Sequence, residues 1–198
     1  SHAAAGWQIN GHAIGLEAAL GFRYASDTRG WHPFMPVMHG IAGACGLFLA
    51  PLQFSDRLRA RYAKVHRVIG RIYVVAALIL APLGAYIQYI EEPLGASRSF
   101  TVAAIVDAAV LLITTGIGFA FALKRMIPQH RQWMTRSYAL AITFFEIRFI
   151  LGVTGLDQPP DPAIAEIVVW SCVALGVLVG DIANQWYELA GRSRARAS

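Results

Sequence analysis

Long apolar runs, separated by short polar stretches, dominate this chain. Five such runs cover residues 34–54, 68–90, 100–123, 131–154 and 164–185. Each is long enough to cross a bilayer as a helix, which takes roughly 20 apolar residues. The fourth run is the least apolar, because Arg136, Glu146 and Arg148 interrupt it. No Gly/Ser-rich linker separates the runs, so the pattern predicts one all-α domain, a polytopic membrane protein.

The composition agrees with this fold class and narrows the partners. Hydrophobic residues make up 56% of the chain and charged residues 15%, whereas a soluble domain usually carries about 25% charged residues. Cys45 and Cys172 both lie inside apolar runs and form no CxxC pair, which argues against a disulfide framework or a zinc site. The basic residues flank apolar segments, so we expect the lipid bilayer as partner and no nucleic acid.

Lys and Arg residues are concentrated in three polar regions that alternate with acidic ones. They lie between the first and second runs, between the third and fourth, and after the fifth. With alternating crossings, these three regions share one face of the membrane, and the positive-inside rule assigns that face to the cytoplasm. Glu91, Glu92 and the acidic LDQPPDP stretch fall on the opposite face. The sequence therefore predicts a multi-pass protein of the bacterial inner membrane with a cytoplasmic C-terminus.

The predicted topology divides the chain into three parts. Residues 1–33 are too polar to span a membrane and are expected outside the cytoplasm, residues 34–190 form the transmembrane domain, and residues 191–198 form a basic cytoplasmic tail. The sequence begins at Ser1 and not at a methionine. A preceding signal peptide and an earlier transmembrane helix both stay open.

A weak internal repeat relates the first two runs to the third and fourth. HRVIGRIY, which begins at His66, resembles HRQWMTRSY, which begins at His130 and has one extra residue. Two parallel hairpins of this kind predict a four-helix bundle around a pseudo-two-fold axis, with the fifth helix added outside. The repeat would bring both histidines to one depth. The extra residue turns Arg136 by about 100° around its helix relative to Arg71.

The repeat defines an inner cluster of polar residues at the predicted cytoplasmic end. Arginine and tyrosine there are typical of residues that anchor a helix at the lipid headgroups. Anchoring does not require histidine, and two neutral imidazoles could instead coordinate the iron of one haem b. The arginines would then pair with the haem propionates, or with a quinone or an anionic lipid headgroup. The cluster contains His66, Arg67, Arg71, Tyr73, His130, Arg131, Arg136 and Tyr138.

A second polar cluster is predicted deeper in the membrane, toward the outer face. It consists of His39, Asp107, Glu146 and Arg148. Ionisable groups at this depth normally face the bundle interior or a water-filled cavity. They could neutralise one another, or form a proton relay or a quinone pocket with His39 as the titratable member. Residues two apart on a helix diverge by about 200°, so we predict the pairs Arg148–Asp107 and Glu146–His39.

Three stretches of residues 39–151 resemble a family of bacterial predicted membrane proteins, the domain-of-unknown-function family 2306. They are HGIAGACGLFLAPLQF, the Arg-rich loop that ends in HRVIGRIY, and HRQWMTRSYALAITFFEIRF. The resemblance implies a multi-helix membrane protein and brings no activity with it. Members of that family commonly have an additional helix ahead of the first motif.

The expected architecture is also similar to that of the transmembrane cytochromes b, which hold two haems with four histidines on a four-helix core. Here only His39, His66 and His130 lie in or next to the predicted core helices. A second bis-histidine haem is therefore not expected, and the likeness is one of architecture alone.

Three functions are consistent with these observations. The leading hypothesis is a redox-associated membrane subunit that binds one haem b, a quinone or an anionic lipid headgroup at the His66/His130 end. The alternatives are a non-catalytic accessory subunit that stabilises a larger membrane complex, and a small proton-coupled transporter that uses the outer cluster. Whether the chain is an enzyme stays open, and no substrate follows from the sequence.

Overall fold

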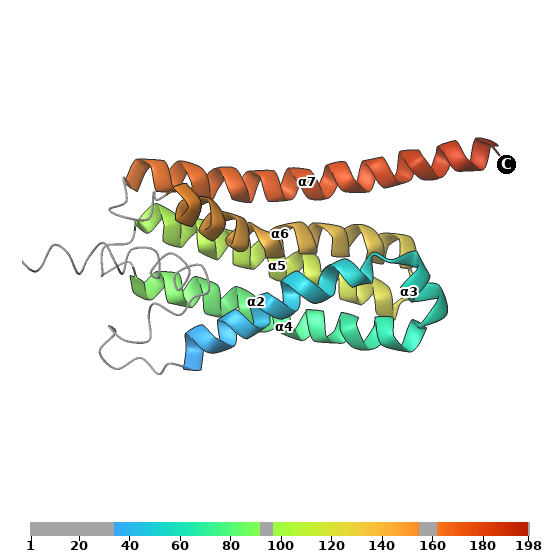
Figure 1. Cartoon of the computed structure of the whole chain (residues 1–198), viewed down its shortest axis with the longest axis horizontal. Coiled ribbons are helices and arrows are strands. Elements are labelled where there is room, and N and C mark those ends of the chain that lie inside the picture. Colours follow the sequence, from blue (N-terminus) through green and yellow to red (C-terminus); the bar gives the residue numbers. More distant parts are fainter. Residues whose placement is uncertain (1–33, 92–96, 155–161, 198) are drawn as a thin grey trace, which may run out of the picture.

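The computed structural model describes residues 34–91, 97–154 and 162–197, and every element within them is a helix. The all-α prediction is therefore confirmed. Figure 1 shows long helices that run side by side, with one short helix at the end of the molecule near the C-terminus. In chain order the helices are α2 (Phe34–Gln53), α3 (Asp56–Arg61), α4 (Ala63–Glu91), α5 (Arg98–Leu123), α6 (Ile127–Thr154) and α7 (Pro162–Ala197).

The long helices follow the five predicted runs closely. Within the described ranges, α4, α5, α6 and the 166–189 part of α7 are long and apolar enough to cross a membrane, and the apolar part of α2 (Val37–Gln53) is shorter. α4 and α6 both begin several residues before the predicted runs, because their polar first turns are helical too. α7 has 36 residues and continues through 191–197 of the predicted basic tail. The predicted outer segment 1–33 and all of the LDQPPDP stretch except its last proline lie outside the described residues.

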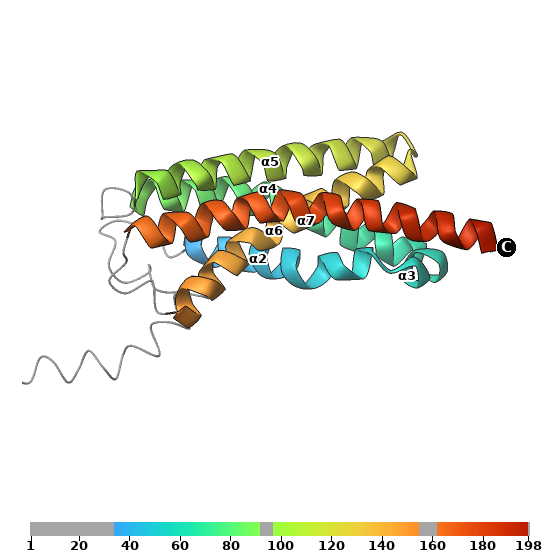
Figure 2. The same cartoon turned by 90° about the horizontal axis from the view of Figure 1, so that it is seen from above.

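Four helices close a ring around a common core. α2 contacts α4, α4 contacts α5, α5 contacts α6, and α6 returns to α2. α7 packs outside this ring against α6 and, less extensively, against α5, as the two perpendicular views show (Figures 1 and 2). The predicted four-helix bundle with a fifth helix is thus confirmed. The main core cluster is built largely from small and branched side chains, with Ala76, Leu80, Leu111 and Leu140 among its buried members.

Two glycines on α7 allow its backbone to approach α6 closely. A Cβ atom at Gly176 would lie 2.6 Å from Thr143 Oγ1, and one at Gly180 would lie 3.1 Å from Arg136 Cα. The two glycines are four residues apart, a spacing that lets membrane helices pack with small separations. This packing fixes the side of α6 that α7 covers, which decides the orientation of Arg136 described below.

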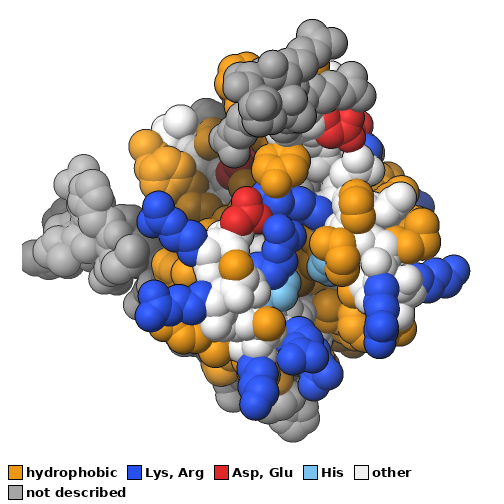
Figure 3. Space-filling view, turned by 90° about the vertical axis from the view of Figure 1, so that its right-hand side faces the viewer, with side chains coloured by type: hydrophobic (Ala, Val, Ile, Leu, Met, Phe, Trp, Pro, Cys, Tyr) orange, Lys and Arg blue, Asp and Glu red, His pale blue; other side chains and the backbone are white. Residues whose placement is uncertain are grey.

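The three basic regions lie at one end of the bundle. The connection between α2 and α4, the turn between α5 and α6 and the end of α7 all lie at the right-hand end of Figure 1. Viewed onto that end, blue Lys and Arg side chains surround an opening in which histidine is visible (Figure 3). The sequence did not predict α3, which forms here because Ser55 caps it by accepting a hydrogen bond from the Leu58 N–H.

Candidate functional site

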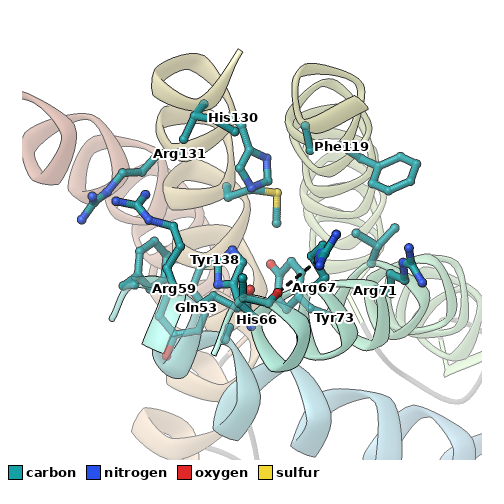
Figure 4. Close-up of a pocket in the computed structure, with 18 of the residues that line it drawn as sticks. Gln53, Arg59, His66, Arg67, Arg71, Tyr73, Phe119, His130, Arg131 and Tyr138 are labelled. Atoms are coloured by element: carbon teal, nitrogen blue, oxygen red, sulfur yellow. Dashed lines mark hydrogen bonds between the residues drawn. The ribbon is translucent and has the colours of Figure 1, made fainter. Parts of the chain in front are cut away.

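A cavity of about 580 Å³ lies at the basic end of the bundle, between α2, α3, α4, α5 and α6. This volume is within the range of ordinary small-molecule and cofactor sites, ~300–1,000 Å³. Its walls are largely apolar, with Phe54, Val74, Phe119 and Met134 among the lining residues, and charged side chains surround its opening (Figure 4). Seven of the eight residues of the predicted inner cluster line it: His66, Arg67, Arg71, Tyr73, His130, Arg131 and Tyr138.

The two histidines occupy equivalent places in the internal repeat. His66 lies in the first turn of α4 and His130 in the first turn of α6, each three residues after the helix begins. Both side chains line the cavity. The fold therefore brings these two residues to one site, as the repeat predicted.

The His130 ring is held by a backbone carbonyl of the neighbouring helix. Its Nδ1 atom lies 2.8 Å from the Gly118 carbonyl oxygen. A carbonyl only accepts, so Nδ1 carries the proton and donates this bond, and in the neutral ring Nε2 keeps a free lone pair. Close approach of α5 and α6 makes the bond possible, since a Cβ at Gly118 would lie 2.7 Å from Met134 Sδ. Metal-binding histidines are commonly oriented by a bond of this kind.

Two other lining residues have buried nitrogen atoms without a partner. They are His66 Nδ1 and Gln53 Nε2. The Gln53 side chain lies over α4 at Gly70, where a Cβ would come within 3.2 Å of Gln53 Oε1. Buried polar atoms in proteins are nearly always bonded to protein or ordered water. Both atoms are also shielded from a water-sized probe, so the two side chains would have to rotate to present them to a ligand in the cavity.

The charges that surround the cavity are mostly positive. Arg59, Arg67, Arg71 and Arg131 line it, and Asp56 is the acidic residue among the lining residues. Asp56 accepts hydrogen bonds from Arg59 at 3.0 Å and from Arg131 at 3.1 Å. Arg67 donates to the Ala63 carbonyl of its own helix. The site therefore has a net positive charge suited to a carboxylate or a phosphate.

Arg131 joins three helices at the opening of the cavity. Its Nη1 atom donates to Asp56 on α3 and also to the Tyr187 hydroxyl on α7, at 2.6 Å. The guanidinium carbon lies 3.7 Å from the centre of the Tyr187 ring, a cation–π contact. α7 thus contributes to the site through one arginine, although none of its residues is among those that line the cavity.

Arg136 does not line the cavity, unlike the other seven residues of the predicted inner cluster. Its Nε atom donates to Asp181 on α7 at 2.6 Å, and its guanidinium lies 5.1 Å from the Trp133 ring. The extra residue in the second copy of the repeat explains this outcome, because it turns Arg136 away from the position of Arg71. We therefore assign Arg136 to the contact between α6 and α7.

A buried chain of three hydroxyl groups forms part of the inner end of the bundle, and sequence reasoning missed it. The Ser137 hydroxyl lies 2.8 Å from that of Tyr73 and 2.7 Å from that of Thr115, so the chain joins α4, α6 and α5. All three residues are at most 2% exposed. Tyr73 follows His66 by seven residues, and Ser137 follows His130 by seven. This equal spacing from the two histidines was the sequence signal that could have identified Tyr73 and Ser137 as a pair. The extra residue in the second copy of the repeat instead aligned Tyr73 with Tyr138.

Tyr138 still lines the cavity, half-buried against the ring of Phe54 at 5.6 Å between centroids. Gln53 on α2, Phe54 just after it and Arg59 on α3 also line the site, and the sequence did not single them out. Gln53 and Phe54 end the first predicted span, and Arg59 lies in the basic connection that follows it. A residue in a connection can fold back onto a neighbouring helix, and hydrophobic periodicity does not report such a contact.

The outer cluster is arranged differently from the prediction. Both carboxylate oxygens of Asp107 are buried without a partner, so the predicted pair with Arg148 does not form. Arg148 acts electrostatically on His39, whose ring also lies at the Leu80 carbonyl. The charge near His39 is that of Arg148, and His39 Nδ1 has no hydrogen-bond partner, so the predicted pair of Glu146 with His39 does not form either. Glu146 lies on the side of α6 that faces Cys172 of α7. Glu146 and Arg148 point to different sides of α6, as predicted from their spacing. Arg148 is directed toward α2 and Glu146 toward α7, which are not the partners that were predicted.

The His39 ring lies directly against α4 at Gly84. A Cβ atom there would come within 2.9 Å of His39 Cε1. Glycine is therefore required at this position for the ring to lie on the helix backbone, and His39 Nδ1 stays buried without a partner. His39 is held by packing and does not line the inner cavity.

Residues 36–183 match the family model described as predicted membrane protein (DUF2306). The chain belongs to the DUF2306 family. The match spans the inner cavity, from Ala50 to Tyr138, and the whole outer cluster, and it ends before Tyr187. No curated protein and no solved structure matches the chain. Membership in DUF2306 establishes a membrane protein, and the chemistry of the cavity has to be argued from its residues.

Proposed function

We propose that this chain is a redox-associated membrane subunit that binds one haem b in the inner cavity, with His66 and His130 as axial ligands. The observation that carries the proposal is the convergence of two histidines from different helices on one cavity. Each has a ring nitrogen without a protein partner: Nε2 of His130, whose other nitrogen is bonded to Gly118, and Nδ1 of His66, which is buried and would face the cavity only after the ring turns. A neutral imidazole with one free nitrogen is the form that binds iron.

The remaining lining residues suit the rest of such a group. Apolar side chains would contact the macrocycle and exclude water, and Arg67, Arg71 and Arg131 would pair with the two propionates. Small residues among the lining residues, Ala50 and Ala122, leave room for a flat group beside the helix backbones. A haem held by these residues would supply one-electron transfer between its ferric and ferrous states.

A quinone or the headgroup of an anionic lipid is the second candidate ligand. The observation that favours it is the hydroxyl chain, because Tyr73 lines the cavity and is bonded through Ser137 to Thr115. A chain of this kind can donate to a carbonyl oxygen of a quinone. The Gln53 amide, which has a buried nitrogen without a partner, supplies a further donor.

The absorption spectrum of the purified chain distinguishes the two ligands. Expressed in a host that makes haem and purified in detergent, the protein should be coloured. Its Soret and α bands should shift on reduction with dithionite, as expected for a low-spin bis-histidine haem. A colourless protein that takes up no added haem would contradict the haem proposal, and quinone or phospholipid extracted in a fixed ratio to protein would support the second candidate.

We further propose that the basic end of the bundle, and with it the cavity, faces the cytoplasm of a bacterium. The support is the arginine- and lysine-rich end in Figure 3, interpreted by the positive-inside rule. Single cysteines introduced at Ala60 and Ser193 of a chain in which Cys45 and Cys172 are replaced by alanine should resist an impermeant thiol reagent in intact cells. They should react after the cells are opened. Labelling of both in intact cells would show the opposite orientation.

A further inference from the structure

We propose that Asp107 is a proton-binding site inside the membrane, separate from the inner cavity, at which a neutral carboxylic acid exchanges its proton. Asp107 lies in the middle of α5 and is 0% exposed. Neither of its carboxylate oxygens has a hydrogen-bond partner. The proposal concerns a different part of the bundle from the haem site and does not depend on which ligand the cavity binds.

Among the described residues, Asp107 has neither an ion pair nor a hydrogen bond that could stabilise a negative charge on its carboxylate. Arg148 is directed toward His39 and Glu146 toward Cys172, so the described part of the chain gives Asp107 no ion pair. An ionised carboxylate without an ion pair or hydrogen bonds is very unfavourable in a membrane interior, and such a group normally becomes neutral by binding a proton.

The burial of Asp107 also restricts the ligand to a proton. Its surface has no contact with a water-sized probe, so there is no space beside it for a hydrated cation. A bare metal ion needs several oxygen ligands. The described residues contain no group of three or more His, Cys, Asp or Glu side chains arranged to hold one. A proton adds no volume and removes the charge.

A second unpartnered group lies at a depth in the bundle similar to that of Asp107. The hydroxyl chain fixes Tyr73 and Thr115 at one level. At 1.5 Å per residue, Asp107 lies about 12 Å from that level along α5, and Gly84, which carries the His39 ring, lies about 16 Å along α4. His39 Nδ1 is therefore a buried proton acceptor at nearly the same depth on another helix.

Infrared spectroscopy of the whole chain in detergent or lipid tests the proposal directly. At neutral pH the wild-type spectrum should contain a C=O stretching band of a protonated carboxylic acid that is absent from Asp107→Asn. Asp181→Asn, which removes a half-exposed carboxylate paired with Arg136, is the matched control and should keep the band. Transfer to D₂O should move the band to lower frequency if the proton exchanges.

Isotope labelling keeps the test valid if Asp107→Asn fails to fold. Aspartate labelled with ¹³C at the side-chain carboxyl, incorporated into the wild-type chain, should lower the frequency of the same band, whereas labelled glutamate should not. A wild-type spectrum without any C=O band from a protonated aspartate would show that Asp107 is ionised and would overturn the proposal. A band that does not respond to D₂O after a day would overturn the exchange part, because the proton would then be a fixed structural feature.

Discussion

Replacing either cavity histidine, His66→Ala or His130→Ala, should abolish the six-coordinate haem spectrum. Each histidine would supply one of two axial bonds, and no other described lining residue offers an imidazole. Changing a residue that merely orients a metal ligand typically costs ~10–100-fold in affinity, so removing a ligand itself should cost at least about 100-fold. Haem content per chain and the spin state of the residual pigment, from absorption and electron paramagnetic resonance spectra, measure the effect.

Two arginines on α6 provide a matched pair of controls for this experiment. Arg131 and Arg136 are each ion-paired to an aspartate, but only Arg131 lines the cavity. Arg131→Gln should weaken haem binding and shift its midpoint potential, because a positive charge near the propionates is lost. Arg136→Gln should leave the spectrum unchanged. Retention of a normal spectrum in both histidine variants, with the chain still folded, would rule out these two residues as ligands.

Ser137→Ala should destabilise the bundle by about 1–3 kcal/mol, the usual cost of leaving a buried polar group without its partner. Ser137 is 0% exposed, and its hydroxyl is the one that Tyr73 and Thr115 both contact. Thr115 can bond to a carbonyl of its own helix, as Thr114 does to Val110. Tyr73 is left without that option, since its hydroxyl lies too far from its own backbone.

A double-mutant cycle separates this effect from a simple loss of packing. Tyr73→Phe in the Ser137→Ala background should recover part of the lost stability, because the stranded hydroxyl is then removed. Ser171→Ala, at an exposed position on α7, is the control for the substitution itself. Unfolding of the detergent-solubilised chain by heat or by a denaturing detergent gives the comparison. Equal stability of Ser137→Ala and Ser171→Ala would show that the hydroxyl chain contributes nothing.

The sequence by itself determined which segments form the long helices and which end of the bundle is basic. Both follow from local physics: a bilayer requires long apolar helices whose backbone groups are bonded internally, and the charge of the connections does not depend on how the helices pack. The repeat also placed His66 and His130 at one site, because each occupies the same position at the start of an apolar helix and the two helices run parallel.

Only the tertiary structure decided which polar side chains meet. The direction of Arg136 depends on which side of α6 is covered by α7, and Gly176 and Gly180 set that contact. Asp107 lost its predicted partner for a related reason, since depth along a helix follows from residue number, whereas the direction of a side chain depends on how each helix is rotated in the bundle. That rotation is set by the sum of many weak packing contacts between helices, which no single motif in the sequence records.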